Sequence, residues 1–296
     1  MVAEITPQAV EEPPAVPLAR EEGPAVGVPN GERLAYESQF HDQWAHEMDL
    51  DSLDPERLFS CPTTPENVFS RRRLGDLQGK MLMDLGCGPG ESSVGLALAG
   101  ARVAAVDISP GMLEVARQLA ERYGVADRVT THCMPAEALG FPDAYFDVIY
   151  GRDVLHHTNL ERSIPEIARV LKPGGMAIFT EPLGHNPIIE VYRRLASVVR
   201  TPFEEPLTYS KIRAMRRYFA RVEHTEFQFL TLGIFLWFFF GERAHPSKVR
   251  YWKKIVVEAD RYAPAFRRLQ NLDERLFRFL PFLRRYCWNT VIELYK

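Results

Sequence analysis

Between Lys80 and Glu181 the chain alternates short apolar runs with amphipathic segments, and this alternation constrains its fold more than any other feature. The runs expected to form strands are MLMDLG, ARVAAVDIS, RVTTHCM, YFDVIYG and GMAIFTE. Runs that are nearly continuously apolar are typical of buried parallel strands, and helices between them supply right-handed crossovers. The pattern predicts an α/β fold with a doubly wound, Rossmann-like, mostly parallel sheet.

The segments between these runs carry helix signals. The clearest is GMLEVARQLAERYG, which has Ser109 as a candidate N-cap, Pro110 at the first helical position and Gly124 after the end. ESSVGLALAG and NLERSIPEIARVLK are the other two predicted helices.

After Glu181 the alternation stops. Helices are expected near 187–199 and 208–218, followed by a strand in ARVEHTEFQFLTL and a last strand in YCWNTVIELYK. About 50 residues of hydrophobic and basic, helix-like sequence separate these two strands, and an insertion of that length is normally functional or a subdomain. We expect a domain at 76–232, a helical C-terminal insertion at 233–285 before the last strand, and that strand at 286–296.

Before this domain we expect a tail and a cap. Residues 1–31 hold six prolines among Glu, Ala and Val, a composition that predicts a disordered tail. Residues 32–75 are expected to form a helical cap, in which Tyr36, Phe40 and Trp44 lie four apart on one helical stripe.

The formal charge of −3 hides an asymmetry: residues 1–66 carry −11, residues 67–240 carry +1 and residues 241–296 carry +7. The four cysteines are scattered without metal-ligand spacing, so no metal site is predicted. The acidic, proline-containing start is unlike a signal peptide, which favours a cytoplasmic protein. The longest apolar stretch, 229–240, is shorter than the ~20 residues that span a bilayer.

A glycine-rich segment, Asp84-Leu85-Gly86-Cys87-Gly88-Pro89-Gly90, directly follows the first predicted strand and opens a helix. Glycines there let the backbone turn sharply and approach a ligand closely. Asp107 ends the second strand nineteen residues after Gly88, where an acid accepts hydrogen bonds from ribose hydroxyls. The combination predicts a cofactor of the adenosine type.

The spacing also favours one such cofactor. A dinucleotide loop has its third glycine one residue later than Gly90, and a helix N-terminus free to hold a pyrophosphate. Here Glu91 begins the helix, where an acid opposes a phosphate and tolerates a cation. S-adenosylmethionine, which carries a sulfonium, therefore fits better than NAD.

These motifs, together with PAEALGFPDAYFDVIYGRDVLHH and RVLKPGGMAIFTEP, resemble those of class I S-adenosylmethionine-dependent methyltransferases. The similarity is to the small-molecule group related to the ubiquinone and menaquinone methyltransferases, and it covers roughly residues 75–185. The resemblance implies the class I methyltransferase fold and transfer of a methyl group to a small molecule.

The resemblance also implies which residues meet the cofactor. They are Asp84, Gly86, Cys87, Gly88, Asp107, Ile108, Ala136, Glu137 and Arg152. Many relatives have an acid before the Ala-Glu pair, whereas this chain has Met134 and Pro135. The adenine contact is therefore expected from backbone or from Glu137.

Methyl transfer depends mainly on how the cofactor and the acceptor are positioned. An acceptor oxygen of high pKa also needs a base to remove its proton. His156 and His157 follow the fourth strand, His185 follows the fifth, and all three are candidate catalytic bases; Tyr209 is a weaker candidate. The alternative for the His-His pair is packing or capping of the next helix.

The acceptor has to be inferred from the C-terminal third. FLTLGIFLWFFF and the basic segments WKK, FRRL and LRRY predict a hydrophobic acceptor site, ordinary core packing or peripheral membrane contact. Two other functions stay open: a nucleic-acid methyltransferase, and a non-catalytic membrane-associated protein that keeps the fold. No nucleic-acid partner is expected, because Gly151-Arg152-Asp153-Val154 replaces the Asn/Asp-Pro-Pro-aromatic motif. Nothing in the sequence indicates an oligomeric state.

Overall fold

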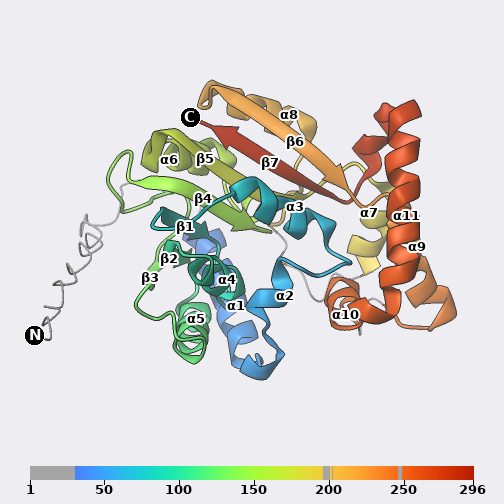
Figure 1. The fold of residues 1–296 in the computed structure, drawn as a ribbon, viewed down its shortest axis with the longest axis horizontal. Coiled ribbons are helices and arrows are strands. Elements are labelled where there is room, and N and C mark those ends of the chain that lie inside the picture. Colours follow the sequence, from blue (N-terminus) through green and yellow to red (C-terminus); the bar gives the residue numbers. More distant parts are fainter. Residues whose placement is uncertain (1–30, 196–200, 202, 246–248) are drawn as a thin grey trace, which may run out of the picture.

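A computed structural model describes residues 31–195, 201, 203–245 and 249–296, and its centre is one seven-stranded sheet (Figure 1). The strands lie in the order β3-β2-β1-β4-β5-β7-β6. Their bounds are β1 Met81–Leu85, β2 Arg102–Asp107, β3 Val129–Cys133, β4 Phe146–Arg152, β5 Leu171–Pro182, β6 Arg221–Phe227 and β7 Asn289–Tyr295.

Strands β1 to β5 pair in parallel, and β7 runs antiparallel between β5 and β6. The order reverses between β1 and β4, the point at which a doubly wound sheet opens a crevice at the carboxyl ends of its strands. The predicted Rossmann-like, mostly parallel sheet is confirmed.

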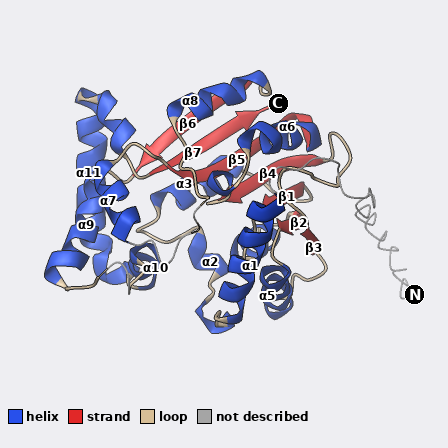
Figure 2. Ribbon diagram, turned by 180° about the vertical axis from the view of Figure 1, so that it is seen from behind, coloured by secondary structure: helices blue, strands red, loops and turns tan. Residues whose placement is uncertain are grey.

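Alternate residues of each strand point to opposite faces, and each face has its own core. In β1, Met83 and Leu85 belong to the core formed with α6 (Leu160–Val170) and α8 (Tyr209–Ala214). Leu82 belongs to the core formed with α3 (Pro65–Leu74), α4 (Glu91–Leu98) and α5 (Pro110–Arg122). Figure 2 shows helices on both sides of the sheet. Burial on both faces explains why the strands are apolar runs rather than alternating ones.

The three helices predicted between the strands have bounds close to those expected, and the cap expected at 32–75 is formed by three separate helices. They are α1 Gly31–His46, α2 Pro55–Leu58, α3 Pro65–Leu74, α4 Glu91–Leu98, α5 Pro110–Arg122 and α6 Leu160–Val170, with short 3-10 turns at Leu50–Ser52 and Leu155–His157. Ser109 caps α5 as predicted, accepting a hydrogen bond from the Met112 N–H.

The remaining helices follow β5. They are α7 Pro187–Leu195, α8 Tyr209–Ala214, α9 Gly233–Leu236, α10 Tyr251–Val257 and α11 Ala259–Phe279, with 3-10 turns at Met215–Arg217, Leu230–Leu232 and Pro281–Tyr286 and a π-helical turn at Trp237–Gly241.

Helices α9, α10 and α11 lie between β6 and β7 in the sequence. In space they lie together at one end of the sheet (Figure 1). Because β7 begins opposite the end of β5, where Asn289 pairs with Pro182, this end is the carboxyl edge of the parallel strands. A third hydrophobic core, built around Phe235, Phe238 and Phe266, holds these helices together and includes Ile189 of α7. The apolar stretch 229–240 is only partly buried, since Phe240 is 74% exposed.

Two predictions fall wholly or partly outside the described residues. The tail at 1–31 is one, except that Gly31 already belongs to α1; the end of the helix expected at 187–199 is the other, since α7 is described to Leu195. Among the described residues, no helix combines the length and the apolar character needed to cross a bilayer.

Candidate cofactor and acceptor site

A cavity of about 380 Å³ opens at the carboxyl edge of the sheet. The glycine-rich loop after β1, the ends of β2 and β4 and the loop after β3 form one half of its wall. Helix α1 and residues of α7, α10 and the start of β7 form the other half. Parallel α/β sheets bind ligands at this position.

The glycine-rich loop needs glycine for steric reasons. Gly86 has φ +67°, and a Cβ there would lie 2.4 Å from Cγ2 of Val154. Gly90, the N-cap of α4, has φ +85°, and its Cβ would lie 2.6 Å from the Cβ of Ala116. Gly88 also has a positive φ, but the space beside it is open and it lines the cavity. The loop is thus packed on one side and open to a ligand at Gly88.

Asp107 lies at the end of β2, as predicted, and lines the cavity. Its Oδ2 accepts a hydrogen bond from the Gly88 N–H at 2.8 Å, and its Oδ1 accepts one from the Ser109 N–H at 2.9 Å. Burial raises the pKa of this carboxyl against these two bonds. Each carboxylate oxygen has two lone pairs, so acceptor capacity remains for ligand hydroxyls.

Asp84 does not line the cavity, in contrast to the prediction that it meets the cofactor. Its Oδ2 accepts hydrogen bonds from the hydroxyls of Ser92 and Ser93 at 2.7 and 2.6 Å, which ties β1 to the first turn of α4. Burial raises the pKa of Asp84 to about 6, although both serines oppose the shift. Asp84 therefore holds the two ends of the glycine-rich loop, β1 and α4, together.

The other predicted cofactor residues lie on the cavity. They are Cys87, Ile108, Ala136, Glu137 and Arg152, and Met134 and Pro135 join them. Glu137 accepts hydrogen bonds from the Arg33 guanidinium of α1 and from the Asn159 N–H at 2.7 Å. Because its carboxylate is held in this way, Glu137 links α1 to the loop after β4.

His156 and Glu181 form a buried pair between the ends of β4 and β5. His156 Nδ1 lies 2.8 Å from Glu181 Oε2, and the carboxylate also accepts bonds from the backbone N–H groups of Val154 and Leu155 at 2.9 and 2.7 Å. Burial raises the pKa of Glu181 to about 7. The carboxylate fixes the backbone of this turn, and His156 itself reaches the cavity wall.

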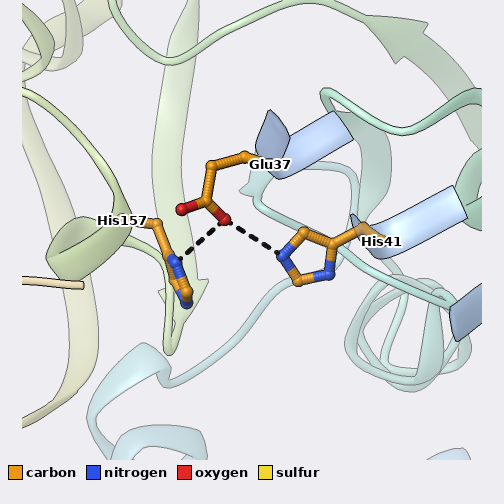
Figure 3. Close-up of side chains that lie close together, drawn as sticks. All are labelled: Glu37, His41 and His157. Atoms are coloured by element: carbon orange, nitrogen blue, oxygen red, sulfur yellow. Dashed lines mark ion pairs between the residues drawn. The ribbon is translucent and has the colours of Figure 1, made fainter. Parts of the chain in front are cut away.

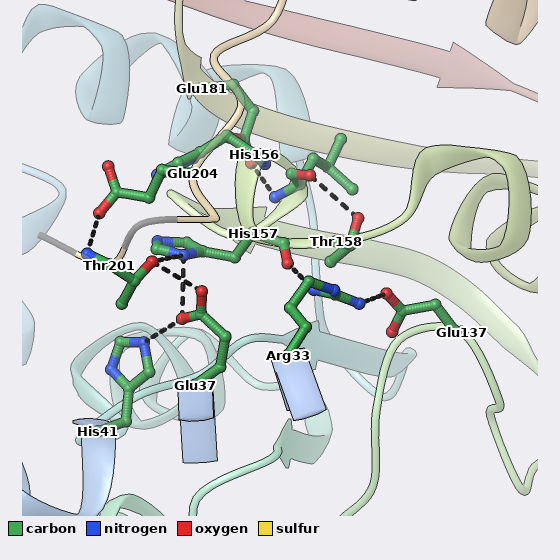
Figure 4. Close-up of polar contacts among 11 residues, drawn as sticks. Arg33, Glu37, His41, Glu137, His156, His157, Thr158, Glu181, Thr201 and Glu204 are labelled. Carbon is green, nitrogen blue, oxygen red and sulfur yellow. Dashed lines mark hydrogen bonds and ion pairs between the residues drawn. The ribbon is translucent and has the colours of Figure 1, made fainter. Parts of the chain in front are cut away.

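His157 faces α1 across the cavity wall, where its partners are Glu37 and His41 (Figure 3). Its Nδ1 lies 3.2 Å from Glu37 Oε2, and the Thr201 hydroxyl donates to Glu37 Oε1 at 2.7 Å. Burial opposes a charge on His157, but the Glu37 carboxylate outweighs it and raises the pKa. Figure 4 shows that Arg33 also donates a hydrogen bond to the His157 carbonyl. Helix α1 therefore contacts His157 through two side chains, Arg33 and Glu37.

Glu37 and His41 were missed by the sequence reasoning. The i, i+4 spacing on one helical face was visible, but their meeting with His157 depends on how α1 docks, about 120 residues away along the chain.

His185 does not line the cavity, so the structure does not support it as a catalytic base. Its ring stacks on Tyr209 with 5.3 Å between centroids, and the Tyr209 N–H approaches its Nε2 at 3.5 Å. Tyr209 likewise lies off the cavity.

The half of the cavity away from the glycine-rich loop is mainly apolar. Its wall includes Phe40, Trp44, Ile189, Tyr192, Trp252, Ile255, Val256 and Trp288. Polar side chains also reach this wall, among them Gln228, Asn289 and buried Glu66. Glu66 accepts hydrogen bonds from the Gln228 amide at 2.9 Å and from the Asn289 amide at 3.2 Å. Burial raises the pKa of Glu66 to about 7.

Residues 83–179 match the family model described as a methyltransferase domain. That range runs from β1 to β5 and contains the glycine-rich loop, Asp107 and the His156–His157 turn. Over this range the chain is similar to methyltransferase domains.

Curated relatives of this methyltransferase domain act, by their names, on small molecules. The demethylmenaquinone methyltransferase of Tropheryma whipplei (strain Twist) is 37% identical over 112 residues, which are 37% of this chain and 45% of that protein. The 27-O-demethylrifamycin SV methyltransferase of Amycolatopsis mediterranei (strain S699) is 39% identical over 99 residues, 33% of this chain and 36% of that protein. The chain thus spans less than half the length of these relatives.

Solved structures support the fold of the methyltransferase domain. Haemonchus contortus phosphoethanolamine N-methyltransferase 2, in complex with S-adenosylhomocysteine, aligns with a TM-score of 0.53 at 21% identity, over 78% of this chain and 52% of that one. Geranyl diphosphate C-methyltransferase of Streptomyces coelicolor A3(2) gives a TM-score of 0.53 at 19% identity, over 78% and 79%. The helices beyond residue 179 lie outside the family match.

Proposed function

We propose that this chain transfers a methyl group from S-adenosylmethionine to a small hydrophobic acceptor. One observation carries the proposal: a single cavity joins the glycine-rich loop and Asp107 to a half lined by aromatic and aliphatic side chains. A reaction between a cofactor and an apolar acceptor needs both halves in one space.

The cofactor half fits an adenosine-bearing ligand. Gly88 leaves open space beside the backbone, and Asp107 is fixed by two backbone N–H groups with lone pairs still available for ribose hydroxyls. Ile108 and Ala136 offer apolar contacts for the adenine. When bound, S-adenosylmethionine supplies a methyl group activated by its sulfonium, and the protein's part is mainly to orient the reactants and exclude water.

The acceptor half sets the class of substrate. Trp252, Ile255 and Trp288 favour an apolar ring or chain, and Glu66 offers one polar contact point. The names of the relatives, a demethylmenaquinone and a demethylrifamycin methyltransferase, support an acceptor of isoprenoid, quinone or polyketide type. Helix α1 closes this half, with Phe40 and Trp44 on its cavity side.

Of the three histidines predicted as catalytic, we propose that His157 is the one that acts on the acceptor. It lines the cavity beside α1, and its ring is held by Glu37. His156 is assigned a positioning role, because its Nδ1 and the surrounding backbone are tied to Glu181.

The test is incubation of the purified chain with S-adenosylmethionine carrying a deuterated methyl group and an organic extract of quinones and polyketides. We expect an acceptor whose mass rises by one deuterated methyl group, and much less of this product with Asp107→Ala. Asp127→Ala removes an exposed acid and should leave the yield unchanged. A product formed equally by Asp107→Ala, or none from any hydrophobic acceptor, would contradict the proposal.

A further inference from the structure

Three potential metal ligands meet at the cavity wall, from two distant parts of the chain (Figure 3). Glu37 and His41 are one turn apart on α1, and His157 ends the 3-10 turn after β4. Glu37 Oε2 lies 3.2 Å from His157 Nδ1 and 3.7 Å from His41 Nε2, and all three ligand atoms lie within 4.8 Å of one another.

The carboxylate oxygen at the centre of this group lacks a hydrogen bond. Glu37 is only 3% exposed, and its Oε2 makes no hydrogen bond of acceptable geometry within the described part of the chain, although both imidazole nitrogens lie at ion-pair distance. Burial of an acceptor without a donor costs free energy, so such an atom requires an explanation. A cation held between Oε2 and the two nitrogens would supply one.

The distances suit a first-row transition metal. Nitrogen and oxygen ligands of Zn²⁺ lie ~2.0–2.2 Å from the ion, which in a tetrahedral site separates the ligand atoms by about 3.4 Å. The two distances measured from Glu37 Oε2 lie on either side of that value. Two imidazoles with one carboxylate suit Zn²⁺ and similar ions, whereas Mg²⁺ and Ca²⁺ prefer oxygen ligands alone.

The outer contacts also suit a metal site. The second oxygen of Glu37 accepts from the Thr201 hydroxyl at 2.7 Å, which is how ligating carboxylates are usually held (Figure 4). Glu37, His41 and His157 all line the cavity that the acceptor enters.

We infer that Glu37, His41 and His157 bind one divalent transition-metal ion of the Zn²⁺ type, with an open coordination position that takes an oxygen of the acceptor. The identity of the acceptor oxygen rests on the proposed function; the binding of the ion does not. An acceptor hydroxyl bound to such an ion releases its proton to solvent at a lower pH than a free hydroxyl does. His157 then acts on the acceptor as a metal ligand.

The site is tested by isothermal titration of the full chain, without a histidine tag and stripped with a chelator, with Zn²⁺. We expect one ion per chain, and a loss of affinity in Glu37→Gln, His41→Gln and His157→Gln larger than the 10–100-fold typical of losing an outer partner. His46→Gln and Glu47→Gln, exposed on or next to the same helix, are the matched controls and should bind as the parent does. Absence of saturable binding, or equal binding by all five variants, would overturn the site.

X-ray absorption spectroscopy at the zinc edge needs only the parent chain, so it tests the site even if a ligand variant fails to fold. The parent chain should show two imidazole ligands, and a spectrum without imidazole ligands would refute the proposal. Titration with S-adenosylhomocysteine tests the cofactor half independently. Zinc binding without cofactor binding would overturn the proposed function and leave the metal site standing, and the reverse result would overturn the metal site alone.

Discussion

Single residues decide whether the backbone can form the loop that receives the cofactor. Gly86 combines a left-handed φ of +67° with the side chain of Val154 directly where a Cβ would stand. Gly79 has a similar φ of +71° but has nothing within 4 Å of that position. An alanine at Gly79 would therefore meet backbone strain alone, whereas an alanine at Gly86 would meet both strain and a steric clash.

We predict that Gly86→Ala lowers the free energy of unfolding by more than about 3 kcal/mol, because strain and clash add. Gly79→Ala should cost about 1–2 kcal/mol, the strain alone. Urea denaturation of the parent and both variants measures the difference. Equal losses in the two variants would show that Val154 moves aside freely.

At the scale of single residues, the cofactor site was largely predictable and the acceptor side was not. Gly88 and Asp107 follow strands that apolar runs reveal, and neighbouring parallel strands bring their carboxyl ends together. The place of Asp84 after β1 does not reveal that Ser92 and Ser93 engage its carboxylate, and its contact with the cofactor stays a prediction. His185 has the same strand-end position as a site residue but turns toward Tyr209.

Among the helices, α1 matters most for the site, because it contacts the loops after three strands. Ser38 donates to the Ile108 carbonyl at 3.0 Å, and Asp42 accepts from the Gly111 N–H at 2.8 Å at the start of α5. Arg33 pairs with Glu137, and Glu37 with His157. The helix was predictable from its sequence, but its docking was not, since it depends on these contacts between distant segments.

We predict that Asp42→Ala loosens α1 without unfolding the sheet, because it removes an anionic acceptor at the N-terminus of α5. Such contacts are worth about 1–2 kcal/mol. Hydrogen exchange in residues 31–46 should become faster, while exchange in β1 and β4 stays unchanged. Glu47→Ala, an exposed acid just after α1, is the control. Unchanged exchange in the Asp42 variant would mean that the other contacts alone hold α1.

For the whole molecule, buried carboxyl groups link stability to pH. Burial raises the pKa of Glu66 from 4.5 to about 7, so the folded chain binds a proton that the unfolded chain releases between these values. The unfolded state then binds fewer protons, and the contribution of this group to stability falls as pH rises from 4.5 to 7. The amides of Gln228 and Asn289 reduce the shift without cancelling it.

We predict that the stability of the parent relative to Glu66→Gln falls by about 3 kcal/mol between pH 4.5 and pH 7. Urea denaturation at several pH values measures this difference, and Glu47→Gln, which replaces an exposed acid, should show none. A constant difference between parent and Glu66→Gln would mean that Glu66 has the same pKa in the folded and the unfolded chain.

The basic insertion gives the whole molecule its charge polarity. Residues 241–296 carry +7, and Phe279 and Phe282 near the end of α11 are 83% and 61% exposed. Peripheral membrane contact through this region stays a prediction. We expect the chain to float with anionic vesicles at low salt, and the double variant Phe279→Ser, Phe282→Ser to float less. Equal flotation of both proteins, or flotation of neither, would contradict it.

The central claim, that the carboxyl edge of this sheet holds S-adenosylmethionine, is tested most directly by calorimetric titration of the purified chain with S-adenosylhomocysteine. We predict saturable binding of one ligand per chain, weakened about 10–100-fold by Asp107→Ala through loss of a charged hydrogen-bond acceptor. Asp127→Ala should bind as the parent does. No binding by the parent, or full binding by a folded Asp107→Ala variant, would contradict the account.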